Sequence, residues 1–388
     1  MHSQDDLLTD TVTDVNAFVD RFASEHEAGW IAYRRERHCS PEPSGEESET
    51  SHSICERLKS LGIGAKITDR GVGVVGDLLL GDATDKTPAI ALRADIDALP
   101  IIEDSGAEWS STHSGCMHAC GHDGHTAALL ATARWLKQHE SELSRQVILL
   151  FQPAEEGGHG AREMIREGAL EGVSEIYGWH NWPALPYGTM ACPDGLVMCG
   201  NGTFDITLKG KGGHASQPEI CTDVVLAGSA IVVAMQQVVS RRLPPQANAV
   251  VSITQFHAGN APTVLADTAT IGGSIRVPDE ATRALINNAI SETATNTAAA
   301  YGVECEVTHH GRYQATINHS AQAQTSRAVW TELYGEKALD HGRPMPVMAS
   351  EDFSYYLREI PGAFALIGSD DGRRNPYPCH SPHYDFND

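Results

Sequence analysis

The sequence predicts an α/β protein whose mostly parallel central sheet is flanked by helices, with an α+β domain inserted into it. Apolar strand-like runs alternate with amphipathic helical stretches in the N-terminal third, and this alternation resumes near the C-terminus. Between them the elements follow the order β-α-β-β-α-β, which is that of a ferredoxin-like unit. We therefore expect a discontinuous first domain, residues 1–199 and 313–388, and a second domain, residues 200–312.

The elements of the first domain are predicted from their periodicity and from their ends. Residues 147–151 form a continuous apolar run, as in a strand buried on both faces. The other predicted strands cover residues 89–93, 176–179 and 363–368, and the predicted helices cover about 7–33, 46–61, 124–136 and 321–334. In the second domain we expect strands at 203–208, 249–256, 268–277 and 304–308, and helices at 223–242 and 279–301.

Charge and composition limit the possible partners. A net charge of −23 over 388 residues argues against binding to nucleic acids or anionic membranes, which requires a basic surface. No run of 18 apolar residues is present to span a membrane, and the acidic N-terminus does not resemble a secretion signal. The nine irregularly spaced cysteines fit reduced thiols, so we expect a cytoplasmic location.

Residues 117–125 are the most informative stretch, because they contain three histidines, a cysteine and an aspartate. Thiolate, imidazole and carboxylate groups are the ligands of zinc-like ions, so Cys120 and His122 are predicted to bind a metal. His118 and His125 are equally compatible with ligation and with a supporting role.

Three further segments carry groups of the same kind. Glu155 and Glu156 follow the apolar strand at 147–151, and one of them can hold a metal while the other takes a proton from water. His180 follows the strand at 176–179, and His380 is favoured over His383 near the C-terminus. In open α/β sheets, sites form at the carboxyl ends of strands, which would bring these segments together.

The inserted domain offers two candidates for contact with a substrate. His214 lies in the glycine-rich stretch KGKGGHAS (209–216), which lacks the Gly-Lys-Ser/Thr ending of a phosphate-binding loop. A histidine on such a turn can stabilise an oxyanion. Arg276, at the end of a predicted strand, can bind a carboxylate with its planar guanidinium.

Taken together, these motifs resemble the M20 metallopeptidase superfamily, in particular its aminoacylase/amidohydrolase branch of hippurate, N-acyl-amino-acid and auxin-conjugate hydrolases. The resemblance extends from about residue 30 to the end of the chain. It rests on the segments LRADIDALP (92–100), MHACGHD (117–123), FQPAEEGG (151–158), GGHA (212–215), SEDFS (350–354) and HSPH (380–383).

The resemblance implies a role for each candidate residue. Two divalent metal ions, Mn²⁺ or Zn²⁺ with Co²⁺ or Ni²⁺ as further possibilities, would be bound by Cys120, His122, Glu156, His180 and His380. Glu155 would be the general base acting on a metal-bridging water, and His214 would polarise the scissile carbonyl. The inserted domain would serve as a lid and as the interface of a homodimer or higher homo-oligomer.

One position departs from the family pattern. Relatives carry Asn-Val-Ile-Pro before the long strand of the lid, whereas this chain has Thr263-Val264-Leu265-Ala266. The family asparagine helps to hold the substrate or the oxyanion, so Thr263 is expected to alter substrate binding.

We therefore predict a metal-dependent amidohydrolase that cleaves an amide C–N bond in a small molecule, most plausibly an N-acyl amino acid. A deaminase of aryl amines or amidines, or a dipeptidase, would use the same site. A metal-bound protein that has lost turnover is the alternative outside catalysis. The spare carboxylate at positions 155 and 156 argues against it, because a structural site needs no base.

Overall fold

A computed structural model describes residues 26–78, 87–372 and 377–388, so the first part of the helix predicted at 7–33 lies outside the described residues. The chain divides into two compact units. Unit 1 comprises Met1–Gly195, Ile317–Arg343 and Tyr355–Asp388, and unit 2 comprises Leu196–Thr316 and Pro344–Ser354. The predicted boundaries at 200 and 312 lie within five residues of these limits, but residues 344–354 also belong to unit 2.

Unit 1 is built on a sheet with the strand order β1-β2-β4-β3-β5-β15-β6. The strands are β1 (Gly64–Ile67), β2 (Val74–Leu78), β3 (Ala89–Asp95), β4 (Val147–Gln152), β5 (Val173–Pro186), β6 (Met190–Ala191) and β15 (Gly362–Asp370). The four central strands β4, β3, β5 and β15 run parallel to one another. The outer pairings, β1 with β2, β2 with β4 and β15 with β6, are antiparallel.

The sheet is therefore mixed, and the prediction of a mostly parallel sheet describes its centre only. Strands β1 and β2 were not predicted, because both are short and only some of their residues are buried, so they lack the continuous apolar run that identifies β4. Both strands nevertheless extend the parallel centre: β2 pairs antiparallel with β4, and a short connection joins it to its antiparallel neighbour β1.

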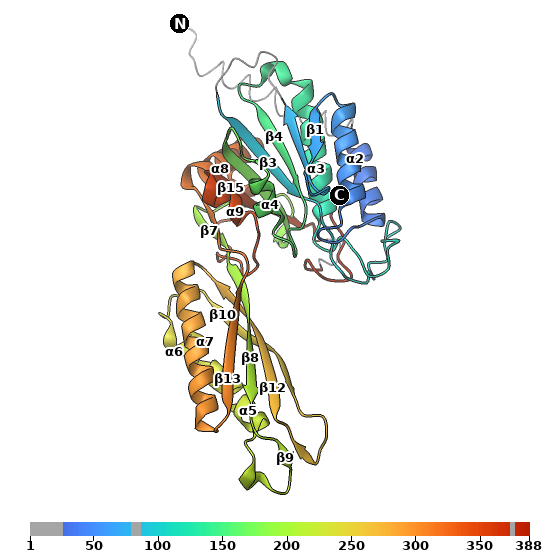
Figure 1. Ribbon diagram of the computed structural model, residues 1–388. Helices are drawn as coiled ribbons and strands as arrows, with labels where there is room; N and C mark the ends of the chain where they lie inside the picture. Colours follow the sequence, from blue (N-terminus) through green and yellow to red (C-terminus); the bar gives the residue numbers. More distant parts are fainter. Residues whose placement is uncertain (1–25, 79–86, 373–376) are drawn as a thin grey trace. The chain divides into compact units, whose positions relative to one another are not determined.

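Helices cover both faces of this sheet (Figure 1). On one face, α2 (Ser48–Ser60), α3 (His122–Gln138) and the helix at residues 26–39 pack against Val147, Leu149 and Phe151 of β4. Side chains alternate along a strand, so Ile148 points to the other face, where it lines a pocket together with Met164 of α4 (Gly160–Arg166). On β15, Ala363 and Ala365 pack with Ala323 of α8 (Ser320–Tyr334).

The strand ends in unit 1 place the candidate residues. As predicted, Glu155 and Glu156 follow the end of β4. The prediction for the next strand was wrong in its length, because β5 continues through His180 to Pro186. The reason is tertiary, since parallel pairing with β15 runs from Ile176 to Pro186 and keeps this segment extended.

Unit 2 contains an antiparallel sheet in the order β10-β12-β8-β13. Its strands are β8 (Gly200–Lys209), β10 (Val250–Ala258), β12 (Thr268–Val277) and β13 (Glu304–Gly311), and its helices are α5 (Val224–Met235), α6 (Gln237–Arg242) and α7 (Glu280–Ala300). Leu208, Ile231 and Ile290 are fully buried in the core that the helices form with the sheet. The β-α-β-β-α-β order is the one predicted, but the helix expected at 223–242 is interrupted at Gln236.

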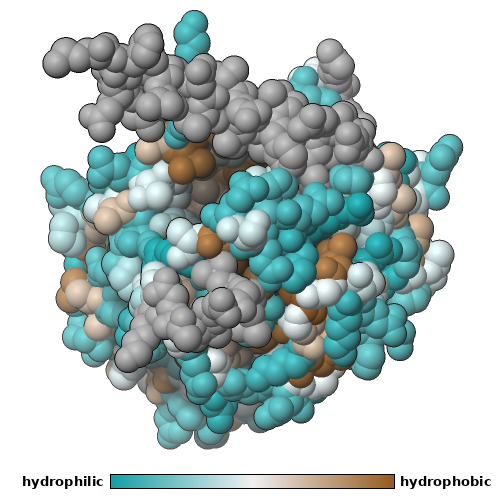
Figure 2. Space-filling model, turned by 90° about the horizontal axis from the view of Figure 1, so that it is seen from above, coloured by the Kyte–Doolittle hydropathy of each residue, from teal (hydrophilic) through white to brown (hydrophobic). Residues whose placement is uncertain are grey.

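The remaining elements are short. They are β7 (Gly195–Met198), β9 (Gly213–His214), β11 (Val264–Leu265), β14 (Thr316–Asn318), α9 (Ser354–Glu359) and three 3₁₀ turns, Glu140–Glu142, Pro218–Ile220 and Glu336–Ala338. The face drawn in Figure 2 is mainly hydrophilic, with apolar residues in small groups between polar ones. Among the described residues, no helix is both long enough and apolar enough to traverse a bilayer.

Candidate metal centre

Cys120 and His122 lie where the chain enters α3. Gly121 between them has a φ of 93°, and a Cβ there would lie 2.4 Å from Oδ1 of Asn181. Only glycine fits this position, since the left-handed backbone and the close neighbour both exclude a side chain. The turn leaves Cys120 and His122 buried at the N-terminus of α3.

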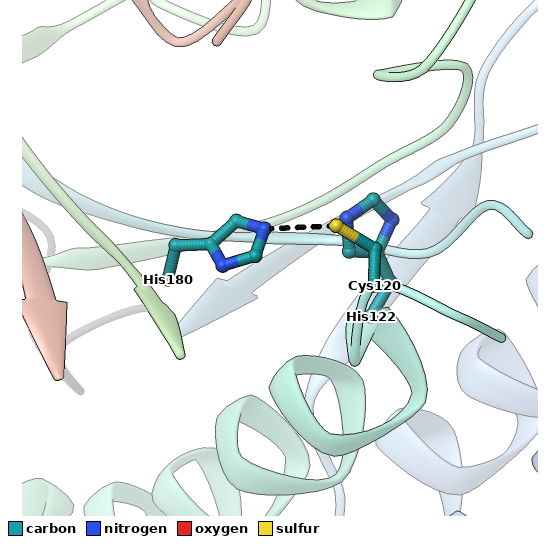
Figure 3. Close-up of side chains that lie close together, drawn as sticks. All are labelled: Cys120, His122 and His180. Atoms are coloured by element: carbon teal, nitrogen blue, oxygen red, sulfur yellow. Dashed lines mark hydrogen bonds between the residues drawn. The ribbon is translucent and has the colours of Figure 1, made fainter. Parts of the chain in front are cut away.

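His180 approaches this pair from β5. Its Nε2 lies 3.3 Å from Sγ of Cys120, and its Nδ1 lies 2.6 Å from the carbonyl oxygen of Asn181 (Figure 3). The contact with that carbonyl fixes a protonated Nδ1, which leaves Nε2 as the nitrogen with a free lone pair. Burial and the neighbouring His125 lower the pKa of His180, so its ring is neutral and able to bind a cation.

Glu155 and Glu156 are held by a strained turn after β4. Ala154 has a φ of 53°, and its amide donates to Oε1 of Glu47 at 2.7 Å. The amide of Glu156 donates to Oδ2 of Asp97 at 2.9 Å. The left-handed conformation of a non-glycine residue costs about 1–3 kcal/mol, so these two buried carboxylates stabilise a turn that the local sequence disfavours.

The C-terminal segment supplies His380. Its amide donates to the carbonyl oxygen of Ala119 at 2.7 Å, which fixes this segment beside the one that carries Cys120. Nε2 of His380 lies 3.0 Å from Oε1 of Glu156. His383 instead contacts the carbonyl oxygen of Asp104, so His380 is the histidine that the fold brings to the cluster.

The predicted ligands form overlapping groups of three residues. Within each group, the ligand atoms lie within 4.8 Å of one another. One group contains Cys120, His122 and His180, and a second contains Cys120, Glu156 and His380. Glu155 belongs to a third group, with His122 and Glu156. Because Cys120 is common to the first two groups, the arrangement can hold two cations side by side, with Glu155 next to them.

The chemistry of the cluster fits a bound cation. In the described part of the chain, Nε2 of His122 is buried without a hydrogen-bond partner, whereas its Nδ1 contacts Asp97 at 3.0 and 3.1 Å. Asp95 and Asp97 outweigh burial and raise the pKa of His122 well above its ordinary value. These carboxylates therefore favour a positive charge at this ring, which a divalent ion on Nε2 would supply.

The sequence analysis missed most of the supporting groups. Asp97 contacts His122 and the amide of Glu156, and Glu47 holds the amide of Ala154. Asp95 was not among the predicted site residues, yet its carboxylate contacts Nδ1 of His125 at 2.6 Å. The Asp95-Ile96-Asp97 sequence at the end of a buried strand was the available signal, but its partners are remote in sequence.

The candidates of the inserted domain lie in unit 2. His214 is exposed on β9, where it pairs with Val264 of β11, and its Nδ1 accepts from the hydroxyl of Ser216 at 2.7 Å. The exposed Thr263 is beside it, since its carbonyl accepts from the amide of Ala215 at 3.0 Å. Arg276 is near the other end of the sheet, where it pairs with Asn201 of β8.

Arg276 is half-buried, and burial together with the neighbouring Arg312 lowers its pKa. Two neighbouring guanidinium groups favour an anion between or beside them. The structure thus brings His214 and Thr263 together, and it keeps Arg276 apart from both.

The chain is similar to known proteins in both sequence and fold. Residues 91–388 match the model of peptidase family M20/M25/M40. The chain is 40% identical over 364 residues to the IAA-amino acid hydrolase ILR1-like 2 of Arabidopsis thaliana, covering 92% of this chain and 81% of that protein. It is 36% identical over 357 residues to the hippurate hydrolase of Campylobacter jejuni, covering 92% and 91%.

Among solved structures, the YXEP protein of Bacillus subtilis, described as a dinuclear metal binding peptidase from the M20 family, aligns with a TM-score of 0.80. It is 32% identical to this chain, and the alignment covers 94% of each chain. The match to the family model covers well over half of the sequence, and it includes every candidate ligand. The chain therefore belongs to peptidase family M20/M25/M40.

Proposed function

We propose that this protein hydrolyses the amide bond of an N-acyl amino acid with the help of two divalent metal ions. The family and its named members make the chain a metal-dependent amidohydrolase. The observation that carries the proposed two-metal mechanism is the cluster of five potential ligands with a further carboxylate, that of Glu155, beside them. The relatives named above act, by their names, on IAA-amino acids and on hippurate, which supports the acyl-amino-acid class.

We assign each ligand to one of the two metal ions by the group of neighbouring side chains to which it belongs. Cys120, His122 and His180 would hold one ion, and Cys120, Glu156 and His380 the other. Bound ions of this kind lower the pKa of water and polarise a carbonyl group. Thiolate and imidazole favour zinc, while the carboxylate also admits manganese, cobalt or nickel.

Glu155 is proposed as the general base. It is buried, it lies within the ligand cluster, and it is not needed to complete either group of three ligands. Its carboxylate would accept the proton of the attacking water and then deliver that proton to the departing amine. The turn fixed by Glu47 and Asp97 would keep this carboxylate at its place between the two transfers.

His214 and Arg276 are proposed to come from different copies of the chain. Thr268 and Arg276 are eight residues apart along β12, which corresponds to about 27 Å at roughly 3.4 Å per residue. His214 pairs with Val264, which precedes Thr268 in the chain, and its strand β9 lies beyond one end of the four-stranded sheet (Figure 1). A small substrate cannot touch both residues of one unit 2, so a homodimer in which His214 comes from the partner subunit resolves the geometry.

In such an arrangement the imidazole of His214 would donate to the oxyanion that develops on the scissile carbonyl. Arg276 would bind the carboxylate of the amino-acid portion. Thr263, beside His214, presents a hydroxyl group where the family pattern has an amide, so it would tune the contact with the substrate.

The first test replaces the base. Glu155→Gln keeps the size of the side chain but cannot accept a proton, so turnover should fall roughly 10²–10⁴-fold while metal content stays unchanged. The matched control is Glu142→Gln, which changes an exposed glutamate in a 3₁₀ turn and should leave both quantities unaltered. Retention of most activity by Glu155→Gln would show that another group is the base.

The second test addresses the substrate. N-acyl amino acids, dipeptides and aryl amines should be compared on enzyme reconstituted with each candidate metal after chelation. We expect hydrolysis of the acyl-amino acids, loss of activity on chelation and recovery with one ion. Preferential turnover of dipeptides or release of ammonia from aryl amines would replace the proposed substrate class, and full metal content without any turnover would indicate a binding protein.

A further inference from the structure

A second cysteine lies beside the proposed metal ligand Cys120. The thiol of Cys379 lies next to Cys120 in the folded chain, although 258 residues separate the two in the sequence. Sγ of Cys379 also lies 3.8 Å from the carbonyl oxygen of Cys120 and 3.9 Å from Nδ2 of Asn181. Cys379 belongs to neither group of three proposed ligands, so the metal centre does not account for it.

The backbone keeps the two cysteines together. The amide of His380 donates to the carbonyl oxygen of Ala119 at 2.7 Å. A backbone hydrogen bond therefore joins the residue after Cys379 to the residue before Cys120. Asn181 also helps to hold the C-terminal segment in place, because its Nδ2, which lies near Sγ of Cys379, donates to the hydroxyl of the buried Tyr384 at 2.7 Å. A disulfide requires two Cα atoms about 4.4–6.8 Å apart, and the backbone hydrogen bond beside both cysteines keeps their main chains close to each other.

From this geometry we infer that Cys120 and Cys379 form a redox-sensitive pair, which closes to a disulfide when the metal centre is empty and thereby removes a ligand from it. All nine cysteines lie among the described residues, and all of them are free thiols in this structure. Closure would take Cys120 away from both ligand groups at once, because it belongs to each of them.

The oxidant is proposed to be a peroxide. One sulfur takes an oxygen atom from hydrogen peroxide, which gives a sulfenic acid and one water molecule. The other thiol then displaces that oxygen as a second water molecule, and the S–S bond forms. Two thiols thus lose two electrons in total, and one peroxide is reduced. Metal on Cys120 opposes the reaction, since ligation and disulfide formation require the same sulfur.

The inference rests on the proposed metal centre and is independent of the proposed substrate. Its test uses the full-length protein after reduction and chelation, treated with hydrogen peroxide with or without prior addition of Zn²⁺ or Mn²⁺. Free thiols are counted, and the linked peptides are identified by mass spectrometry. We expect the metal-free protein to lose two thiols and yield a peptide pair joined through Cys120 and Cys379, and the metal-loaded protein to yield none.

Metal affinity is the second measurement. The oxidised protein should bind Zn²⁺ at least tenfold more weakly than the reduced protein, because changes to supporting residues alone typically cost about 10–100-fold. A thiol reductant should restore binding. Cys379→Ser should bind metal before and after the same treatment, whereas the control Cys55→Ser, at a buried cysteine of α2, should behave like the wild type.

Two outcomes would overturn the inference. One is the absence of the Cys120–Cys379 peptide from the oxidised metal-free protein. The other is an equal loss of metal binding by Cys379→Ser, which would mean that oxidation acts on Cys120 alone. If the reduced wild type binds no metal but still forms the disulfide, the metal centre and its protective effect are rejected while the thiol pair stands.

Discussion

Asp97 illustrates how a single residue can organise the centre without contacting a substrate. Its carboxylate contacts Nδ1 of His122 at 3.1 Å, the hydroxyl of Ser44 at 2.6 Å and the amide of Glu156 at 2.9 Å. The hydrogen bonds from His122 and Ser44 outweigh burial and lower the pKa of Asp97, so it remains a carboxylate. One buried anion therefore orients two proposed ligands, His122 and Glu156.

We predict that Asp97→Asn weakens metal binding about 10–100-fold, the usual cost of altering a residue that orients a ligand. The amide oxygen can still accept from His122, but the amide nitrogen cannot accept from Glu156 or Ser44. Isothermal titration of the metal-free protein would measure the loss. Ser44→Ala, which removes only one of the three contacts, serves as the control and should lose less than Asp97→Asn.

The proposed ligands could be predicted from their residue types, but the residues that support them could not. Cys120, His122 and Glu156 belong to the residue types that bind metals, so they could be proposed from the sequence alone. Glu47 and Asp97 are acidic residues like many others until the fold buries them against Ala154 and Glu156. Cys379 was similarly treated as an ordinary cysteine, because its contact with Cys120 exists only in the folded chain.

At the scale of elements, the helix at residues 26–39 is tied to the start of α3 through a buried histidine. His38 contacts Oδ2 of Asp123 through Nδ1 at 2.9 Å and Oε1 of Glu103 through Nε2 at 3.3 Å. Although burial disfavours the imidazolium, Asp123 and Glu103 raise the pKa of His38 from 6.5 to about 9. The folded protein therefore binds this proton more tightly than the unfolded chain does.

The resulting stabilisation has a defined pH window. It is fully present below pH 6.5, and it is lost as the pH rises through about 9, where the folded protein also releases the proton. The shift corresponds to roughly 3 kcal/mol as an order of magnitude, at about 1.4 kcal/mol per pKa unit. Replacing His38 by Gln should accordingly destabilise the protein at pH 6 and much less at pH 10.

Thermal unfolding of wild type and His38→Gln at several pH values would check this prediction. The difference between their midpoints should shrink between pH 6.5 and 10. His52→Gln, at an exposed histidine of α2 whose Nδ1 bonds to the carbonyl oxygen of Ser48 in the same helix, is the control and should show no such trend. A difference that is constant with pH would mean that His38 acts through packing and not through its charge.

Sequence periodicity located the principal elements but not all of their ends. The continuous apolar run of β4 and the capped start of α7, where Asp279 accepts from the amide of Thr282, are local signals and were predicted closely. The end of β5 depends on its pairing with β15, and that strand lies almost 180 residues further along the chain. Neither β1 nor β2 has a local pattern strong enough to identify it.

For the whole molecule, the proposed dimer makes a prediction that mixing of inactive variants can check. His214→Ala should lower turnover about 10²–10³-fold, as loss of an oxyanion donor typically does. If His214 acts on the partner subunit, mixed dimers of His214→Ala and Glu155→Gln contain one complete site. Random exchange should then restore about one quarter of the wild-type activity, because half of the dimers carry one complete site out of two.

Each variant incubated alone under the same conditions is the control, and the recovered activity should follow the yield of mixed dimers measured by native mass spectrometry. Mixed dimers that stay inactive would place His214 in the site of its own subunit or outside the site. A protein that remains monomeric at assay concentrations while hydrolysing its substrate would reject the proposed dimer altogether.

The sequence by itself determined the class of chemistry and the family. Ligand types, their order along the chain and the acidic pair at 155–156 are local features that do not depend on folding. Only the tertiary structure decided which histidine of the last segment joins Glu156, which carboxylates support the ligands, and that Cys379 lies against Cys120. These are contacts between segments far apart in sequence, and they arise because the sheet gathers its connecting segments at one place.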